Sequence, residues 1–360
     1  MQVVSDFLRK HHINNDTFAI GVSGGADSLA LALLFKEAYP QFHLIALTVD
    51  HQLRPSSRKE ALYVAEVMKR FGIEHHILPW EGEKPQTGIE EQARIARYHL
   101  LCHWCKQHNV KYLAIAHHLF DQAETFLMRL QRGSGLFGLS SMQEISNKDG
   151  ITILRPLLNI NPQDLKEYLE QQNIAWVEDE SNQNTDYLRV TMRKFLPILE
   201  EKCSITPSDI SLAVENLQRT REFIEVIVQQ TIQDSVHMWD DCGCSFDKAI
   251  FLQWHEELQF HILGQLIKNI GNQIYIPEAE ALMQLISQLK SADFCGATLG
   301  GVYFCICDLR IWLIKEYRTE NLSYSEKDWA DFEKERTDVR GIKIPAKLKQ
   351  ALLYEKNHKK

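Results

Sequence analysis

The chain has 360 residues and a net charge of −8 at pH 7, with 44% hydrophobic and 24% charged residues. This composition is ordinary for globular proteins and excludes extended disorder, and the length predicts two or three domains. The eight cysteines are too few and too scattered for a disulfide framework, and no apolar run approaches the ~18 residues of a membrane span. We therefore expect a cytoplasmic protein with no membrane partner. The acidic total also argues against non-specific coating of nucleic acid.

Short apolar strands alternate with helices over the first 155 residues. The predicted strands cover residues 17–22, 43–49, 77–78, 111–116 and 151–154. The predicted helices cover residues 28–38, 89–109 and 121–132, and a capping box at 57–60 opens a further element. This alternation predicts right-handed βαβ crossovers and an α/β fold with a doubly wound, mostly parallel sheet.

The pattern changes after residue 160. Asn161-Pro162 and Thr206-Pro207 are helix start signals, and the sequence from there to about Lys290 is nearly all helical in period, with a break near Gly271. Residues 301–315 predict a strand pair that turns near Asp308. We expect an α/β domain over 1–200, a helical domain over 205–315 that ends in the strand pair, and a charged tail over 316–360.

The strongest local signal is the loop Ser23-Gly24-Gly25-Ala26-Asp27-Ser28, which follows the first predicted strand. Two glycines let the backbone approach a ligand, and the N–H groups of the loop and the helix start face an anion. The loop lacks the Lys-Ser/Thr of Walker A and the three-glycine dinucleotide fingerprint. A plain Gly-Gly turn is the alternative, but the carboxyl end of a strand in such a sheet is where ligands bind.

Further polar residues follow the other strands. Asp50 and His51 could meet a ribose, a metal or a cationic substrate, or could belong to a solvated loop. Arg94 and Arg97 share one helix face, which alone is typical of a solvated basic surface.

Two histidines stand beside two carboxylates at the next predicted helix. Asp121 and Glu124 are three residues apart, so both can point into the crevice at the strand ends, although acids also stabilise a helix N-terminus. The spacing of His117-His118 to these acids is not a recognised zinc pattern. Arg132 lies in a basic, glycine-rich segment after this helix, and Arg189 and Arg193 lie in a second mixed-charge cluster. Both segments suit phosphate contact or a solvated loop.

Taken together, these segments resemble the tRNA(Ile)-lysidine synthetase family of PP-loop ATP pyrophosphatases. The matching residues, in chain order, are Ser23–Ser28, Val49-Asp50-His51, Leu53-Arg54-Pro55, Ala96-Arg97-Tyr98, His117-His118, Asp121–Thr125, Arg132–Gly135, Arg155–Leu158, Glu178-Asp179, Ser181-Asn182, Tyr187, Arg189, Arg193 and Leu196-Pro197. The resemblance is strong over about 18–200 and weak beyond. Phe120 replaces a family acid, Val190 replaces a family Asn, and the small extra domain of the family's long forms is missing or cut short.

The resemblance implies that lysine is added to C2 of the wobble cytidine of the CAU-anticodon tRNA(Ile), through an adenylated cytidine, with release of AMP and pyrophosphate. It implies ATP at Ser23–Ser28 (thus Ser23, Gly24, Gly25, Ala26, Asp27 and Ser28), Mg²⁺ at Asp27, and stabilisation of phosphate charge by Arg97 and Arg189. Asp121 and Glu124 would bind the lysine ammonium, and one of these two carboxylates would accept its proton. The remaining predicted substrate contacts are Asp50, His51, His117, Arg132 and Arg193. Residues 205–315 would contact the tRNA body, and a homodimer is left open.

Two alternatives remain. A tRNA thiolase could use the same ATP chemistry with Cys102 and Cys105, a CxxC pair, to deliver sulfur. A non-catalytic, nucleotide-dependent tRNA-binding protein would need only the loop and the basic residues.

Overall fold

The structure is a computed structural model that describes residues 2–53, 57–82, 84–85, 87–178, 188–273, 275–316, 326–335 and 343–358. The chain divides into two compact units, Met1–Arg221 and Glu222–Lys360, and the division falls inside the long helix α9 (Pro207–Ser235). Over the described stretches, every helix is too short or too polar to cross a lipid bilayer.

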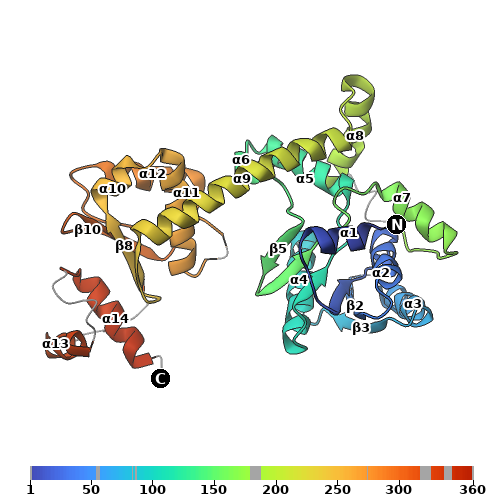
Figure 1. Ribbon diagram of the computed structural model, residues 1–360, viewed down its shortest axis with the longest axis horizontal. Helices are drawn as coiled ribbons and strands as arrows, with labels where there is room; N and C mark the ends of the chain where they lie inside the picture. The colour runs from blue at the N-terminus through green and yellow to red at the C-terminus, as the bar shows by residue number, and fades with distance from the viewer. Residues whose placement is uncertain are drawn as a thin grey trace. The chain divides into compact units, whose positions relative to one another are not determined.

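A six-stranded sheet forms the centre of the first unit, in the order β3-β2-β1-β4-β6-β5 (Figure 1). Its strands are β1 (Thr17–Gly21), β2 (His43–Asp50), β3 (Glu74–Pro79), β4 (Tyr112–Ala114), β5 (Ile145–Lys148) and β6 (Ile151–Leu154). Neighbouring strands pair in parallel except β5 with β6. The predicted α/β fold with a doubly wound, mostly parallel sheet is confirmed. Sequence reasoning missed β5, because Ser, Asn and Lys give this edge strand no apolar signal.

Helices cover both faces of this sheet. The helices of the first unit that precede α9 are α1 (Val3–Lys10), α2 (Ala26–Ala38), α3 (Ser57–Arg70), α4 (Ile89–Gln107), α5 (Leu119–Gln131), α6 (Leu136–Leu139), α7 (Pro162–Gln171) and α8 (Leu188–Cys203). On one face α1, α2, α3 and α7 pack around Phe18 and Ile20, whereas on the other α4 packs against Ala19. Side chains of one strand thus alternate between two cores, as in other parallel sheets. With both faces covered, the strand ends are where a ligand can reach the sheet.

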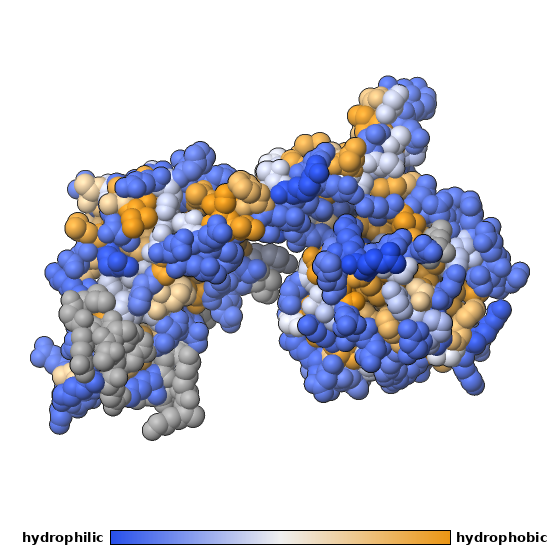
Figure 2. Space-filling model, in the orientation of Figure 1, coloured by the Kyte–Doolittle hydropathy of each residue, from blue (hydrophilic) through white to orange (hydrophobic). Residues whose placement is uncertain are grey.

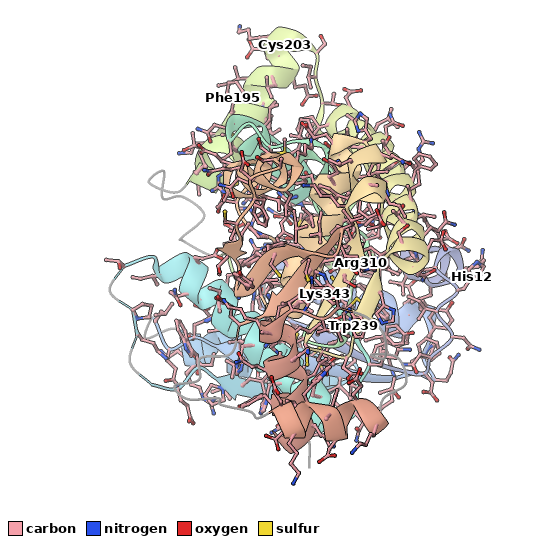
Figure 3. The ribbon with its side chains drawn as sticks, turned by 90° about the vertical axis from the view of Figure 1, so that its left-hand side faces the viewer. His12, Phe195, Cys203, Trp239, Arg310 and Lys343 are labelled. Atoms are coloured by element: carbon pink, nitrogen blue, oxygen red, sulfur yellow. The ribbon has the colours of Figure 1, made fainter. Side chains whose placement is uncertain are left out.

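The outer half of α8 has apolar side chains that are exposed to solvent. Phe195 is 43% exposed and Ile198 is 49% exposed, and orange atoms mark this stretch in the space-filling view (Figure 2). Figure 3 labels Phe195 and Cys203 on this helix. The other end of α8, at Arg189 and Arg193, faces the strand ends of the sheet, as described below.

The second unit is built on a five-stranded antiparallel sheet in the order β7-β8-β11-β10-β9. Its strands are β7 (His237–Trp239), β8 (Gly243–Asp247), β9 (Ala297–Leu299), β10 (Val302–Cys307) and β11 (Arg310–Lys315). Its helices, besides the end of α9, are α10 (Lys248–Gln253), α11 (Glu256–Ile270), α12 (Ala279–Lys290), α13 (Glu326–Glu335) and α14 (Ala346–His358). The predicted C-terminal helical region is therefore present, together with a sheet.

The strand pair over 301–315 is confirmed, with its turn at Asp308 and Leu309 between β10 and β11. The break near Gly271 is also confirmed, since α11 ends at Ile270. The nearly continuous helical pattern before it is wrong at β7 and β8, because short apolar runs do not distinguish strand from helix. A Cβ at Gly243 would lie 2.1 Å from the carbonyl oxygen of Leu313, so glycine here permits close strand pairing.

Both faces of the second sheet are covered. Phe246, Phe304 and Leu313 pack with α11 and α12 on one face. On the other face the Trp239 and Trp312 rings stack with centroids 5.7 Å apart and pack with residues of α14. Trp239 is labelled in Figure 3. The segment expected as a charged tail thus contains a helix with a buried apolar stripe.

Candidate active site

The Ser23–Ser28 loop lies at the carboxyl end of β1 and opens α2. Gly24 has φ +91°, which favours glycine, and a Cβ there would also lie 3.1 Å from Val64. The Ser23 N–H donates to Ser28 Oγ (3.0 Å), and the Ser28 hydroxyl donates to the Gly25 carbonyl (3.0 Å). The Gly24 carbonyl accepts from the Val177 N–H (2.9 Å), which anchors the loop to a distant segment. This fixed loop leads into a helix N-terminus, the arrangement that binds phosphate.

Asp27 stands in the first turn of α2. Its Oδ1 is buried and has no hydrogen-bond partner among the residues that the structure describes, while its Oδ2 lies 3.7 Å from His118 Nε2. Burial raises the pKa of Asp27, and the charge of Asp121 acts in the same direction against that of His118. A buried, unpartnered carboxylate oxygen beside a phosphate-binding loop fits a divalent cation held by one carboxylate and phosphate oxygens.

His118 caps α5 and joins the two carboxylates. Its Nδ1 accepts from the N–H groups of Phe120 (3.2 Å) and Asp121 (3.4 Å), and Asp121 Oδ2 accepts from the His118 N–H (3.1 Å). With Nδ1 used as an acceptor, the ring proton is on Nε2, which lies 3.5 Å from Asp121 Oδ2. One imidazole therefore both starts the helix and faces Asp27 and Asp121.

Asp121 is an ionised carboxylate in a buried position. Burial alone would raise its pKa, but the neighbouring His118, His117 and Arg189 and the hydrogen bond from the His118 N–H outweigh that effect and lower it. Its Oδ1 lies 3.8 Å from Arg189 Nη2 and 3.9 Å from Arg193 Nη2. These longer distances leave Oδ1 available to a cationic group of a substrate.

Glu124, one turn further along α5, is fully buried and paired. Its two oxygens accept from Arg189 Nε (2.9 Å) and Arg193 Nε (2.6 Å), both on α8. Burial alone would lower the pKa of Arg193, but the hydrogen bond to Glu124 raises it. Glu124 therefore fixes two arginines that are each about one-third exposed, and their remaining N–H groups can meet phosphate.

Three further groups add positive charge or polar atoms around the same strand ends. Burial lowers the pKa of Arg97; Tyr98 and Asp121 act against this effect, and the charges of Arg94 and Arg189 act with it. Within the described part of the chain, His51 Nδ1 is buried and has no hydrogen-bond partner. Burial, followed by the charge of Arg97, lowers the pKa of His51 to about 4. His117 is held neutral, since burial lowers its pKa to about 3.

Two predicted residues stand apart from this cluster. Asp50 is bound within its own loop, accepting from the Ser57 hydroxyl and from the Gln52 N–H (3.1 Å). Arg132 is exposed at the end of α5. The predicted motif residues Arg54, Pro55, Asp179, Ser181, Asn182 and Tyr187 lie outside the described residues.

The sequence prediction did not single out two residues that the structure places in the cluster. His118 was not distinguished from His117, because histidine is not among the usual N-cap residues. Arg155, directly after β6, donates from Nε to His117 Nδ1 (3.3 Å). Its only sequence signal was a place in the Arg155–Leu158 motif.

The CxxC pair does not form a reactive site. Cys102 is 1% exposed and Cys105 is 0% exposed, both in the core between α4 and the sheet. Burial raises the pKa of Cys102 to about 11 and that of Cys105 to about 12, so both remain protonated. Among the residues described, no group of three or more His, Cys, Asp or Glu is arranged to hold a metal ion.

Known proteins resemble this chain in sequence and in fold. Residues 2–199 match the PP-loop domain family. The tRNA(Ile)-lysidine synthase of Wolbachia pipientis wMel is 38% identical over 283 residues, covering 78% of this chain and 65% of that protein. The tRNA(Ile)-lysidine synthase of Bradyrhizobium sp. (strain BTAi1) is 33% identical, covering 80% of this chain and 83% of that protein. The chain thus spans about two thirds of the first relative's length.

Among solved structures, the U34-tRNA thiolase NcsA from Methanococcus maripaludis is 21% identical with a TM-score of 0.53. The likeness covers 61% of this chain and 77% of the thiolase, and it shows a shared fold. With the PP-loop match and the lysidine synthase relatives, the predicted family is confirmed: the chain belongs to the tRNA(Ile)-lysidine synthase family of PP-loop proteins.

Proposed function

We propose that this chain uses ATP to join lysine to C2 of the wobble cytidine of the CAU-anticodon tRNA(Ile), forming lysidine and releasing AMP and pyrophosphate. The observation that carries the proposal is the group of charges at one edge of the sheet. A phosphate-binding loop, two paired acid–histidine contacts and two arginines held by a buried carboxylate lie together there. The family membership supports the same reaction.

In the first step the cytidine O2 attacks the α-phosphate of ATP and pyrophosphate leaves. The Ser23–Ser28 loop binds the leaving pyrophosphate with its N–H groups. Arg97, Arg189 and Arg193 stabilise the negative charge that grows on the phosphate in the transition state. The pairing of Arg189 and Arg193 with Glu124 orients both side chains before the substrate arrives.

In the second step the lysine amine attacks C2, and AMP leaves with the former O2. Asp121 takes the ammonium of lysine, because its Oδ1 is the less tightly paired oxygen of an ionised carboxylate. Asp121 then accepts the proton that the amine must lose before it can attack. Both oxygens of Glu124 already accept from arginines, so we assign Glu124 to holding those arginines rather than to the lysine ammonium predicted from the sequence.

Asp27 would hold Mg²⁺ through its unpaired Oδ1. When bound, the ion supplies charge that neutralises the pyrophosphate leaving group. His51, His117, Asp50 and Arg132 remain proposed substrate contacts, and the second unit remains the proposed contact for the tRNA body. We also propose that the protein is cytoplasmic. A homodimer remains a prediction, which a sedimentation experiment would test.

The proposal is tested by incubating the protein with ATP, labelled lysine and, separately, the two CAU-anticodon tRNAs that carry isoleucine and methionine. We expect label in the isoleucine tRNA and release of AMP and pyrophosphate. Label in neither tRNA would contradict the proposed reaction. Release of pyrophosphate with transfer of sulfur instead of lysine would support the thiolase alternative. The burial and protonation of Cys102 and Cys105 argue against that alternative.

A further inference from the structure

Arg155 is a buried arginine whose guanidinium donates to three neutral partners. It is 9% exposed and stands directly after β6, at the strand ends that form the site. Its Nη1 donates to the Gln143 carbonyl (2.8 Å) and to the Ser146 hydroxyl (2.9 Å), and its Nε donates to His117 Nδ1 (3.3 Å). The backbone N–H of Arg155 also donates to the Glu144 carbonyl (2.9 Å), so the residue is anchored at both ends.

The contact with Arg155 decides which nitrogen of His117 carries the proton. A guanidinium has donors and no acceptor, so His117 Nδ1 must be the unprotonated nitrogen. In a neutral imidazole the single proton is then on Nε2. His117 therefore presents an N–H donor at Nε2 and cannot take up a proton there.

The groups around His117 keep its ring neutral. Arg155 after β6, Arg97 on α4 and Arg189 on α8 oppose a positive charge, and Asp121 on α5 favours it. Burial is the largest influence, and together these effects lower the pKa of His117 to about 3. The imidazole ring of His117 is thus neutral near pH 7.

We infer that Arg155 is a positioning residue that fixes His117 as the Nε2–H tautomer, so that His117 donates a hydrogen bond to an oxygen of the substrates and does not act as a base. The acceptor class is an oxyanion or carbonyl oxygen, such as a phosphate oxygen of ATP or the cytidine O2. This inference rests on the proposed function for the identity of the acceptor. The tautomer itself does not depend on it.

A double-mutant cycle tests whether Arg155 acts through His117. We expect Arg155→Met to lower kcat for lysidine formation about 10–100-fold while KM for ATP changes little, because one oriented donor is lost. In a His117→Ala background, Arg155→Met should add less than about 2-fold, since its target is already absent. Ser146→Ala removes another partner of Arg155 without touching His117, and it should stay within about 2-fold of the parent protein.

Equal effects of Arg155→Met with and without His117 would show that Arg155 serves only to hold β5 against β6, and would overturn the inference. Should Arg155→Met fail to fold, Arg155→Lys keeps the charge and one donor and enters the same cycle.

The second readout is nitrogen NMR of histidine-labelled full-length protein, which needs no activity. We expect His117 to show a protonated Nε2 and an unprotonated Nδ1, and to become a mixture of tautomers in Arg155→Met. A protonated Nδ1 in the parent protein would exclude the inference. A correct tautomer in a protein that transfers no lysine would instead contradict the proposed function alone.

Discussion

The two sheets of this protein differ in whether the buried polar side chains beside them have hydrogen-bond partners. In the second sheet, the buried Ser245 Oγ accepts from Trp239 Nε1 (3.0 Å) and from Arg310, two residues labelled in Figure 3. Among the described residues of this unit, one buried side-chain atom is without a partner, Gln259 Oε1 on α11. At the strand ends of the first sheet, Asp27 Oδ1 and His51 Nδ1 are buried and have no hydrogen-bond partner among the described residues. A buried polar atom without a partner costs about 1–3 kcal/mol, so such atoms are expected where a ligand supplies the missing contact.

The difference between the two sheets indicates where substitutions should affect stability and where they should affect function. The antiparallel sheet is covered on both faces by large apolar side chains, including two stacked tryptophans. The parallel sheet is covered as well, but its carboxyl edge gathers carboxylates, histidines and arginines. Substitutions at that edge should therefore change chemistry more than stability, and substitutions under the second sheet should do the reverse.

The largest expected effect is on catalysis, from Asp121→Asn. Lysine transfer should fall about 10³-fold, because the amide can neither hold the ammonium as an ion pair nor accept its proton. The fold should survive, since the amide oxygen can still accept from the His118 N–H and cap α5. Labelled-lysine transfer and tRNA filter binding measure the two properties. The exposed Asp164→Asn on α7 is the control, and unchanged transfer in Asp121→Asn would remove the assigned role.

The next effect is on stability, from Leu352→Ala on α14. This side chain is 2% exposed in the core beneath Trp312, so its truncation should cost about 3 kcal/mol of unfolding free energy. Thermal unfolding should show the loss, while ATP binding by the first unit is retained. Leu252→Ala, which makes the same change at a position 48% exposed, should cost far less. Equal costs would show that α14 is not packed as described.

Acid should destabilise the first unit through its buried histidines. His75 Nε2 donates to Thr48 Oγ1 (2.8 Å), and burial lowers the pKa of His75 from about 6.5 to about 4. Because the unfolded chain binds the proton first, stability is lost as the pH falls from about 6.5 to about 4. After allowance for partial exposure, this loss is about 2 kcal/mol, and His75→Gln should remove it.

Urea unfolding at several pH values measures that slope. His99→Gln, at an exposed position on α4, serves as the control and should leave the slope unchanged. His51 and His117, whose pKa values are also lowered, should keep part of the slope in His75→Gln. A slope as steep as in the parent protein would show that His75 does not contribute to it.

The smallest effect is expected in the phosphate loop. Gly24→Ala places a Cβ on a backbone with φ +91° and 3.1 Å from Val64, which should cost about 1–2 kcal/mol. Gly25→Ala is a matched control, because φ is −72° and the nearest side-chain atom is 3.6 Å away. Chemical unfolding compares the two variants. If Gly25→Ala were the more destabilising, the strained position would have been misassigned.

Local signals predicted much of the fold and part of the site. The strand–loop–helix around Ser23–Ser28, the alternation of strands and helices in the first unit and the strand pair over 301–315 depend on neighbours in sequence, and these are found. The pairing of Glu124 with Arg189 and Arg193 joins residues 65 and 69 positions apart, which no spacing rule anticipates. The tautomer set by Arg155 on His117 likewise depends on a contact between separate strand ends. The strands β5, β7, β8 and β9 were missed because they are short and weakly patterned.

The contact of Glu124 with the arginines of α8 also has a consequence for how the protein is made. Translation proceeds from the N-terminus, so α5 is synthesised before either arginine exists. Until Arg193 has left the ribosome, the Glu124 carboxylate has neither of its guanidinium partners and must stay hydrated. The nascent first unit can thus close around this carboxylate only when α8 arrives, which makes the docking of α8 a late step in its folding.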